Sequence, residues 1–278
     1  MRIGQSQAKI NVTNVGGRLF ERYIYFRDGF RAASIDVEAR KREYETLSKQ
    51  RELPIQLYSV RASQRANPPE LVAMFAYPWK RMSENASWRA LAAIEAFFAW
   101  TEHIFIHLAI LQGRLTTGEE VATIAEAEWK AKFKCAIDIE DKVAKRYLDE
   151  LVILRRQLRN FVAHGVFGKD GEAFHFHSGA GAVPVILDHT LAKPQFSLTP
   201  ELAFHDDEAL ATIEKFIAYL WSGQPEPARI YIQESSLPLI LPKASDGTYA
   251  AAMASVDDMR EFIDYQTAEV DRAANMDW

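Results

Sequence analysis

A short polar segment at the end of a predicted helix carries the residues best suited to chemistry. The stretch "LRNFVAHG" places Arg159, Asn160 and His164 just before Gly165. On a helical wheel of about 100° per residue, these three side chains share the face opposite the apolar stripe that begins at Leu151. The partial negative charge at a helix C-terminus favours an imidazolium, which titrates near neutral pH. The segment therefore predicts a proton donor accompanied by an arginine and an amide.

This combination suits phosphodiester transfer within RNA. Cleavage requires deprotonation of a 2′-hydroxyl, protonation of a leaving oxygen and stabilisation of charge on the phosphorane, and histidine with arginines meets these needs without a metal. The guanidinium fork matches phosphate geometry, so Arg155 and Arg156 on the same helix are predicted to bind substrate. The alternative is an ordinary helix end, in which Arg159 pairs with an acid while Asn160 and His164 cap carbonyls.

The run from Arg159 to His164, at a helix end before glycine, resembles the signature of the HEPN superfamily. That superfamily comprises helical-bundle endoribonucleases of toxin-antitoxin, abortive-infection and CRISPR systems, together with non-catalytic relatives. The resemblance covers residues 86 to about 222 and implies that Arg159 and His164 are catalytic and that Asn160 assists. It implies a homodimer whose two motifs line one cleft. It also implies a polar residue from the first long helix, for which Glu102 is preferred over Glu95.

The composition indicates a globular protein with a sizeable core. The chain has 278 residues, 48% of them apolar, and a formal net charge of −5. This acidic balance disfavours bulk coating of nucleic acid, so contact with RNA should be confined to a patch. The single cysteine, Cys135, can form neither an intramolecular disulfide nor a cysteine-rich zinc site. The N-terminus lacks the apolar region of a secretory signal, and we expect a cytoplasmic protein.

Hydrophobic periodicity and turn signals predict mainly helices with small β elements. The predicted helices span 38–52, 86–112, 116–138, 139–163, 206–222 and 255–275; the first is a solvated charged helix, the second follows a cap at Ser83 or Asn85 and stops at Gly113, and the last is capped by Ser255. A strand pair is predicted over 18–37 around Asp28-Gly29, a hairpin over 166–187 around Asp170-Gly171, and β-like runs over 54–60 and 230–241.

These elements predict a mainly α (α+β) fold built on a HEPN-like helical bundle. Residues 1–80 form an N-terminal α+β extension, 81–223 the bundle with an inserted hairpin, and 224–278 a C-terminal strand-helix extension. The most apolar stretch, residues 93–111, is interrupted by two acids and two histidines. Charges in mid-span are costly in a bilayer, so this stretch is predicted to be a buried core helix and no membrane partner is expected.

Charged and histidine residues on that core helix have two interpretations each. Glu95 and Glu102 must be paired or line a cavity, and a partner such as Arg156 or Arg159 would place the acid in the site. A purely structural ion pair is the alternative. His103 and His107 have the spacing of two metal ligands, with the histidines of the "FHFH" hairpin as possible partners, yet packed histidines are the default and no metal is predicted.

The sequence thus predicts a metal-independent endoribonuclease that needs no cofactor. His164 would act as general acid or base, Arg159 would stabilise the phosphorane, and Asn160 would orient phosphate or the histidine. Products would carry 2′,3′-cyclic phosphate and 5′-hydroxyl ends. A toxin or phage-defence role, with an antitoxin or regulatory protein as partner, follows from the resemblance. The alternative is a non-catalytic module of the same fold that binds RNA, a nucleotide or a protein.

Overall fold

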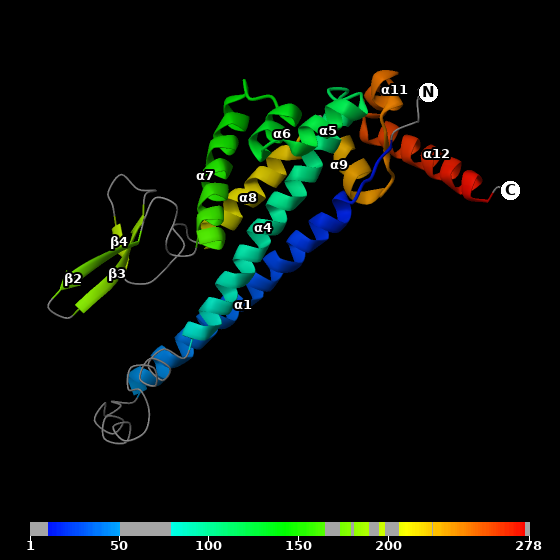
Figure 1. Ribbon diagram of the computed structural model, residues 1–278. Helices are drawn as coiled ribbons and strands as arrows, with labels where there is room; N and C mark the ends of the chain where they lie inside the picture. Colours follow the sequence, from blue (N-terminus) through cyan, green and yellow to red (C-terminus); the bar gives the residue numbers. More distant parts are fainter. Residues whose placement is uncertain are drawn as a thin grey trace. The chain divides into compact units, whose positions relative to one another are not determined.

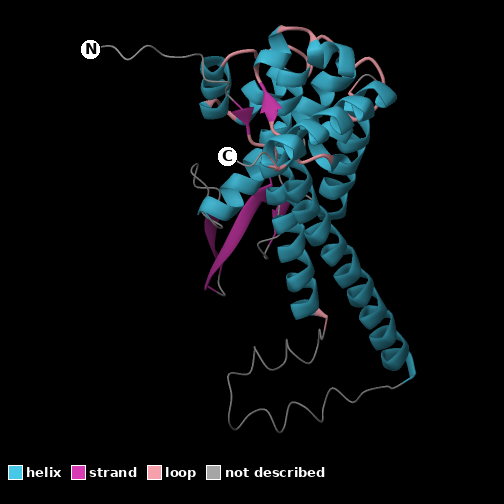
Figure 2. Ribbon diagram, turned by 90° about the vertical axis from the view of Figure 1, so that its right-hand side faces the viewer, coloured by secondary structure: helices cyan, strands magenta, loops and turns pink. Residues whose placement is uncertain are grey.

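A computed structural model describes residues 11–50, 79–164, 173–178, 181–188, 195–197, 206–223 and 225–275. Helices dominate these residues, which confirms the predicted mainly α fold class with small β elements (Figures 1 and 2). The helices are α1 Gly16–Gln50, α4 Lys80–Leu111, α5 Gly118–Glu126, α6 Trp129–Ala136, α7 Lys142–His164, α8 Asp206–Leu220, α9 Glu226–Arg229, α10 Pro242–Ser245, α11 Thr248–Ala252 and α12 Val256–Ala274, with a π-helix at Ile230–Glu234. The strands are β1 Asn11–Val12, β2 Ala173–Ser178, β3 Gly181–Asp188, β4 Gln195–Ser197 and β5 Leu239–Ile240.

The chain divides into two compact units, Met1–Tyr23 with Ile94–Trp278, and Ile24–Ala93. In the smaller unit, Phe30 and Val37 of α1 are buried seven residues apart, the spacing of a helix–helix seam. Arg89 of α4 donates from Nη1 to the carbonyl oxygen of Gly29 at 2.9 Å. Long-range side-chain contacts of this kind stabilise helices that local propensity alone leaves marginal.

Aromatic side chains of α4 form the core of the larger unit. Phe97, Trp100 and Phe105 are fully buried, and Phe105 meets Phe133 of α6 with ring centroids 5.2 Å apart. Phe216 of α8 stacks on Phe133 at 5.7 Å. Among the described helices, Arg81–Leu111 is long and apolar enough to span a membrane, but 72% of its most apolar window is buried in the protein. The prediction of a core helix is therefore confirmed.

The predicted end of α4 and the predicted apolar stripe of α7 agree with the structure, whereas the predicted start of α4 does not. Gly113 ends α4 with φ of +69°, a left-handed conformation that glycine adopts without strain. On α7 the predicted apolar stripe is buried at Leu151, Leu154 and Leu158. α4 begins at Lys80, so the predicted caps near residue 85 lie inside the helix.

The region predicted as a single helix over 116–138 forms two helices. α5 begins with a capping box, in which the Thr117 side chain accepts from the backbone of Glu120 and the Glu120 side chain accepts in return. Ala127 and Glu128 are extended and separate α5 from α6. This break turns α6 so that it presents Trp129 to α4, where the indole Nε1 donates to the Thr101 hydroxyl at 2.9 Å.

The predicted strand pair over 18–37 is wrong, because these residues belong to α1. The aromatic residues that suggested strands include Phe30, which is buried at the helix–helix seam. Asp28-Gly29 makes no turn, and a Cβ at Gly29 would lie 3.6 Å from Cδ of Arg89, an ordinary packing distance. The charged helix predicted over 38–52 is confirmed as far as Gln50. The β-like run at 54–60 lies outside the described residues.

The remaining β predictions are partly correct. Strands β2 and β3 form an antiparallel hairpin within the predicted region 166–187, but the pairing of Ser178 with Gly181 places its turn after Ser178 and not at the predicted Asp170-Gly171. The predicted turn at Asp170-Gly171 lies outside the described part of the chain. In the run 230–241, only Leu239–Ile240 is a strand, which pairs with β1, whereas residues 230–234 are helical.

The helix predicted over 206–222 is confirmed as α8, Asp206–Leu220.

The C-terminal helix α12 begins as predicted. The Ser255 hydroxyl accepts a hydrogen bond from the backbone N–H of Asp258 at 3.0 Å. Phe262 of α12 stacks on Tyr231 with centroids 6.0 Å apart, which fastens the helix to the segment before β5. The domain boundaries at residues 80 and 223 stay a prediction.

Candidate functional site

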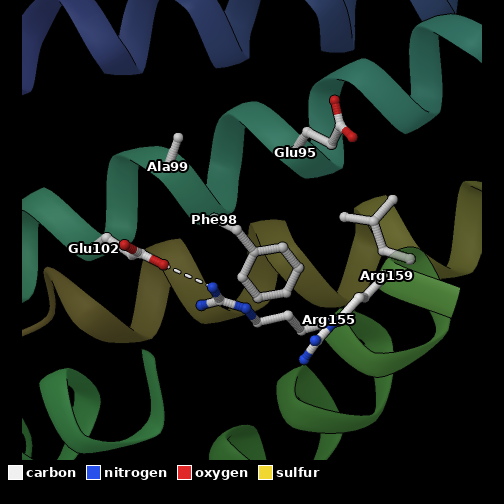
Figure 3. A pocket seen from close by; sticks show the side chains of 7 residues that line it. Glu95, Phe98, Ala99, Glu102, Arg155 and Arg159 are labelled. Atoms are coloured by element: carbon white, nitrogen blue, oxygen red, sulfur yellow. Dashed lines mark hydrogen bonds and ion pairs between the residues drawn. The ribbon is translucent and has the colours of Figure 1, made fainter. Parts of the chain in front are cut away.

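An open pocket lies where α4 and α7 face each other. It has a volume of about 400 Å³. Its lining residues come from three turns of α4 and two turns of α7: Glu95, Phe98, Ala99, Glu102, Arg155, Leu158 and Arg159 (Figure 3). The predicted site residues Glu102, Arg155 and Arg159, and the less favoured Glu95, are thus brought together. Arg156, predicted to bind substrate, is exposed and does not line the pocket.

Glu102 is the centre of a three-residue charged network at one end of the pocket. Its Oε1 accepts from Nη2 of Arg155 at 2.7 Å, and its Oε2 accepts from Nζ of Lys132 at 3.0 Å. The Lys132 side chain is only 7% exposed. In Figure 3 the guanidinium of Arg155 points toward Glu102, beside the ring of Phe98. Its Cζ lies 5.5 Å from the centroid of Phe98 and 5.8 Å from that of Trp129, distances typical of cation–π contacts.

The electrostatics of the network keep Glu102 ionised. Partial burial raises the pKa of Glu102, but hydrogen bonds from Lys132 and Arg155 outweigh that effect and leave the pKa below its ordinary value. A carboxylate held in this way is a poor proton acceptor near neutral pH. Glu102 therefore orients Arg155 and neutralises Lys132, and it is not suited to act as the general base.

The predicted acid lies in the site, but its predicted partners are wrong. Glu102 pairs with Arg155 and Lys132, not with Arg156 or Arg159. Lys132 was missed because α6 contains several lysines, and sequence alone does not separate a buried one from the solvated ones. The available signal was its position between Trp129 and Phe133, both of which are buried.

Arg159 and Glu95 are charged lining residues of the pocket that form no ion pair within the described part of the chain. Both side chains are exposed, and within the described part of the chain neither makes a hydrogen bond or an ion pair. In Figure 3 Glu95 lies at the end of the pocket away from Glu102, and the Arg159 side chain extends from α7 toward Arg155. α7 continues as a helix beyond Arg159 to His164, but the side chains of Asn160 and His164 lie outside the described residues. The roles predicted for these two residues stay predictions.

The histidines of α4 are packed residues. His107 is 2% exposed, and its two ring nitrogens lie 2.9 Å and 3.0 Å from the carbonyl oxygens of His103 and Thr13. Nε2 of His103 accepts from the backbone N–H of Val15 at 3.1 Å. Among the described residues, no group of three or more potential ligands is placed to hold a metal. The pair anchors the segment that precedes α1.

The burial of His103 predicts that the folded protein begins to lose stability at a pH well above the pH at which carboxylates titrate. Burial and the neighbouring His107 lower the pKa of His103 from 6.5 to about 3. Between these values the unfolded chain binds a proton that the native chain does not, so stability present above pH 6.5 is lost as the pH falls. We expect the free energy of unfolding to decrease by about 1.4 kcal/mol per pH unit for this proton.

Urea denaturation at several pH values in this window measures the slope. The variant His103→Gln keeps an acceptor for the backbone N–H of Val15 but does not titrate. The slope of its free energy of unfolding against pH should therefore be shallower by the contribution of about one proton. Equal slopes for the variant and the wild-type protein would contradict the assignment.

Comparison of the chain with protein-family models, with curated proteins and with solved structures finds no match in any of the three.

Proposed function

We propose that this protein is a metal-independent endoribonuclease of the HEPN type. The observation that supports it best is Arg159, an exposed arginine that lines a pocket, has no partner among the described residues and lies just before Asn160 and His164 on the same helix. Anions bind favourably to an arginine that no carboxylate already neutralises. The pocket volume of about 400 Å³ is within the usual range for small-molecule sites.

Each group has one role in the proposed reaction. Arg159 binds the scissile phosphate and stabilises negative charge as the 2′-oxygen attacks phosphorus. His164, at the end of α7, transfers the proton to or from the reacting oxygens, and Asn160 orients the phosphate or the histidine. Arg155 is held by Glu102 at the far end of the pocket and adds positive potential. The products are a 2′,3′-cyclic phosphate and a 5′-hydroxyl.

Incubation of the purified protein with total RNA and tRNA in EDTA tests the activity. We expect discrete RNA fragments whose 5′ ends accept labelled phosphate from a kinase and ATP without prior phosphatase treatment, as 5′-hydroxyl ends do. Cleavage that stops in EDTA would contradict the metal-independent mechanism. Binding of RNA without any cut product would instead support the non-catalytic alternative.

The biological setting is also a proposal. A homodimer would bring two copies of the Arg159–His164 segment to one cleft, and an antitoxin or another regulatory protein would restrain the enzyme in the cytoplasm. Analytical ultracentrifugation measures the first point directly. A monomer at the concentrations that cleave RNA would contradict it.

A further inference from the structure

Two side chains of the pocket that have no partner among the described residues carry opposite charges. Glu95 comes from α4 and Arg159 from α7, and both line the same pocket without forming an ion pair with each other. The second acid and the second arginine of the pocket, Glu102 and Arg155, are already paired. The ligand-binding capacity that remains therefore consists of one acceptor group and one donor group.

The surface of the pocket includes apolar side chains from both helices. Phe98, Ala99 and Leu158 line it together with the charged residues. Phe98 and Leu158 are buried and fixed by packing, whereas Ala99 is exposed and small enough to leave room above α4. A flat, partly apolar ligand with hydrogen-bond donors at one edge and an anionic group elsewhere complements such a surface.

We propose that the pocket binds a guanine nucleotide, with the base at Glu95 and the phosphate at Arg159. This inference rests on the proposed function for its biological meaning, since the nucleotide would be the RNA residue next to the cleaved bond. A carboxylate accepts two hydrogen bonds side by side, and guanine presents two adjacent donors, N1–H and the N2 amino group, on its Watson–Crick edge.

The other bases fit Glu95 less well. Adenine and cytosine each offer one amino group flanked by a ring acceptor, which a carboxylate repels, and uracil offers one N–H between two carbonyls. A two-point contact discriminates between bases by roughly 5- to 150-fold. Because Glu95 is exposed to water, we expect a preference at the lower end, about 5- to 10-fold.

Direct binding measurements test the inference without requiring cleavage. Calorimetric titration with guanosine, inosine, adenosine and uridine 3′-monophosphates should give the tightest binding for guanosine. Inosine keeps N1–H but lacks the N2 amino group, so its affinity should be intermediate. Glu95→Gln should abolish the preference for guanosine, whereas Arg159→Ala should weaken all four nucleotides alike. Glu84→Gln, an exposed glutamate of α4 outside the pocket, is the matched control.

Mapping of cut sites in a synthetic RNA separates this inference from the proposed function. Preferential binding of guanosine 3′-monophosphate that depends on Glu95 supports the inference even if the RNA stays intact, in which case only the nuclease proposal fails. Equal binding of all four nucleotides, or a guanosine preference unchanged in Glu95→Gln, overturns it. Cleavage without any base preference, together with equal binding of the four nucleotides, overturns the inference and leaves the nuclease proposal standing.

Discussion

Replacement of His164 by alanine should lower the rate of RNA cleavage by about 10²- to 10⁴-fold, the usual contribution of a general acid or base. Arg159→Ala should lower it by about 10²- to 10³-fold, since in the proposed mechanism Arg159 stabilises the charge developing on phosphate. Quantification of the fragments released over time from one labelled RNA gives both rates. Arg159→Ala should retain the circular dichroism spectrum and the unfolding midpoint of the wild-type protein, because the Arg159 side chain is exposed and has no partner among the described residues. The same two measurements on His164→Ala establish whether that variant folds.

A matched control distinguishes loss of the site from loss of surface charge. Arg146 belongs to the same helix α7, is 62% exposed and lies outside the pocket. Arg146→Ala should therefore cleave RNA within about twofold of the wild-type rate, aside from weak long-range electrostatics. If Arg159→Ala and His164→Ala both retain cleavage at the wild-type rate, the proposed mechanism is incorrect.

Removal of the negative charge of Glu102 should destabilise the fold. In Glu102→Gln the ammonium of Lys132, 7% exposed, loses its counter-charge. Loss of one partner of a buried pair costs about 3–5 kcal/mol, and we expect about 2–3 kcal/mol here because the Glu102 side chain is 34% exposed. The free energy of unfolding from urea denaturation at neutral pH measures this loss.

A double-mutant cycle tests whether the stability lost in Glu102→Gln comes from the ion pair between Glu102 and Lys132. Lys132→Met removes the buried charge, so adding it to Glu102→Gln should recover part of the lost stability. Glu140→Gln, an exposed glutamate whose side chain makes no interaction within the described residues, should change stability by less than about 0.5 kcal/mol. Strictly additive effects of the two substitutions would show that Lys132 and Glu102 do not stabilise each other.

Local sequence patterns correctly predicted the elements whose signals lie within the element itself, such as an amphipathic stripe or a residue that ends a helix. The stripe of Leu151, Leu154 and Leu158 predicted α7, because an amphipathic pattern of period 3.6 leaves one face to bury. Gly113 and Ser255 predicted helix ends through their own backbone or side-chain chemistry. Residues 18–37 were misread because aromatic content favours strands locally, whereas packing of Phe30 and Val37 in a helix–helix seam favours the helix.

The sequence by itself determined that one helix carries Arg159 ahead of Asn160 and His164, and the family resemblance added the expectation that a polar residue from the core helix would join them. Only the tertiary structure decided which charges neutralise each other. Glu102 is held by Lys132 and Arg155, whereas Glu95 and Arg159 line the same pocket and form no ion pair within the described part of the chain. The physical reason is that these pairings depend on how α4, α6 and α7 are aligned. Phe98 of α4 contacts Trp129 of α6, and Phe216 of α8 contacts both Phe105 of α4 and Tyr147 of α7.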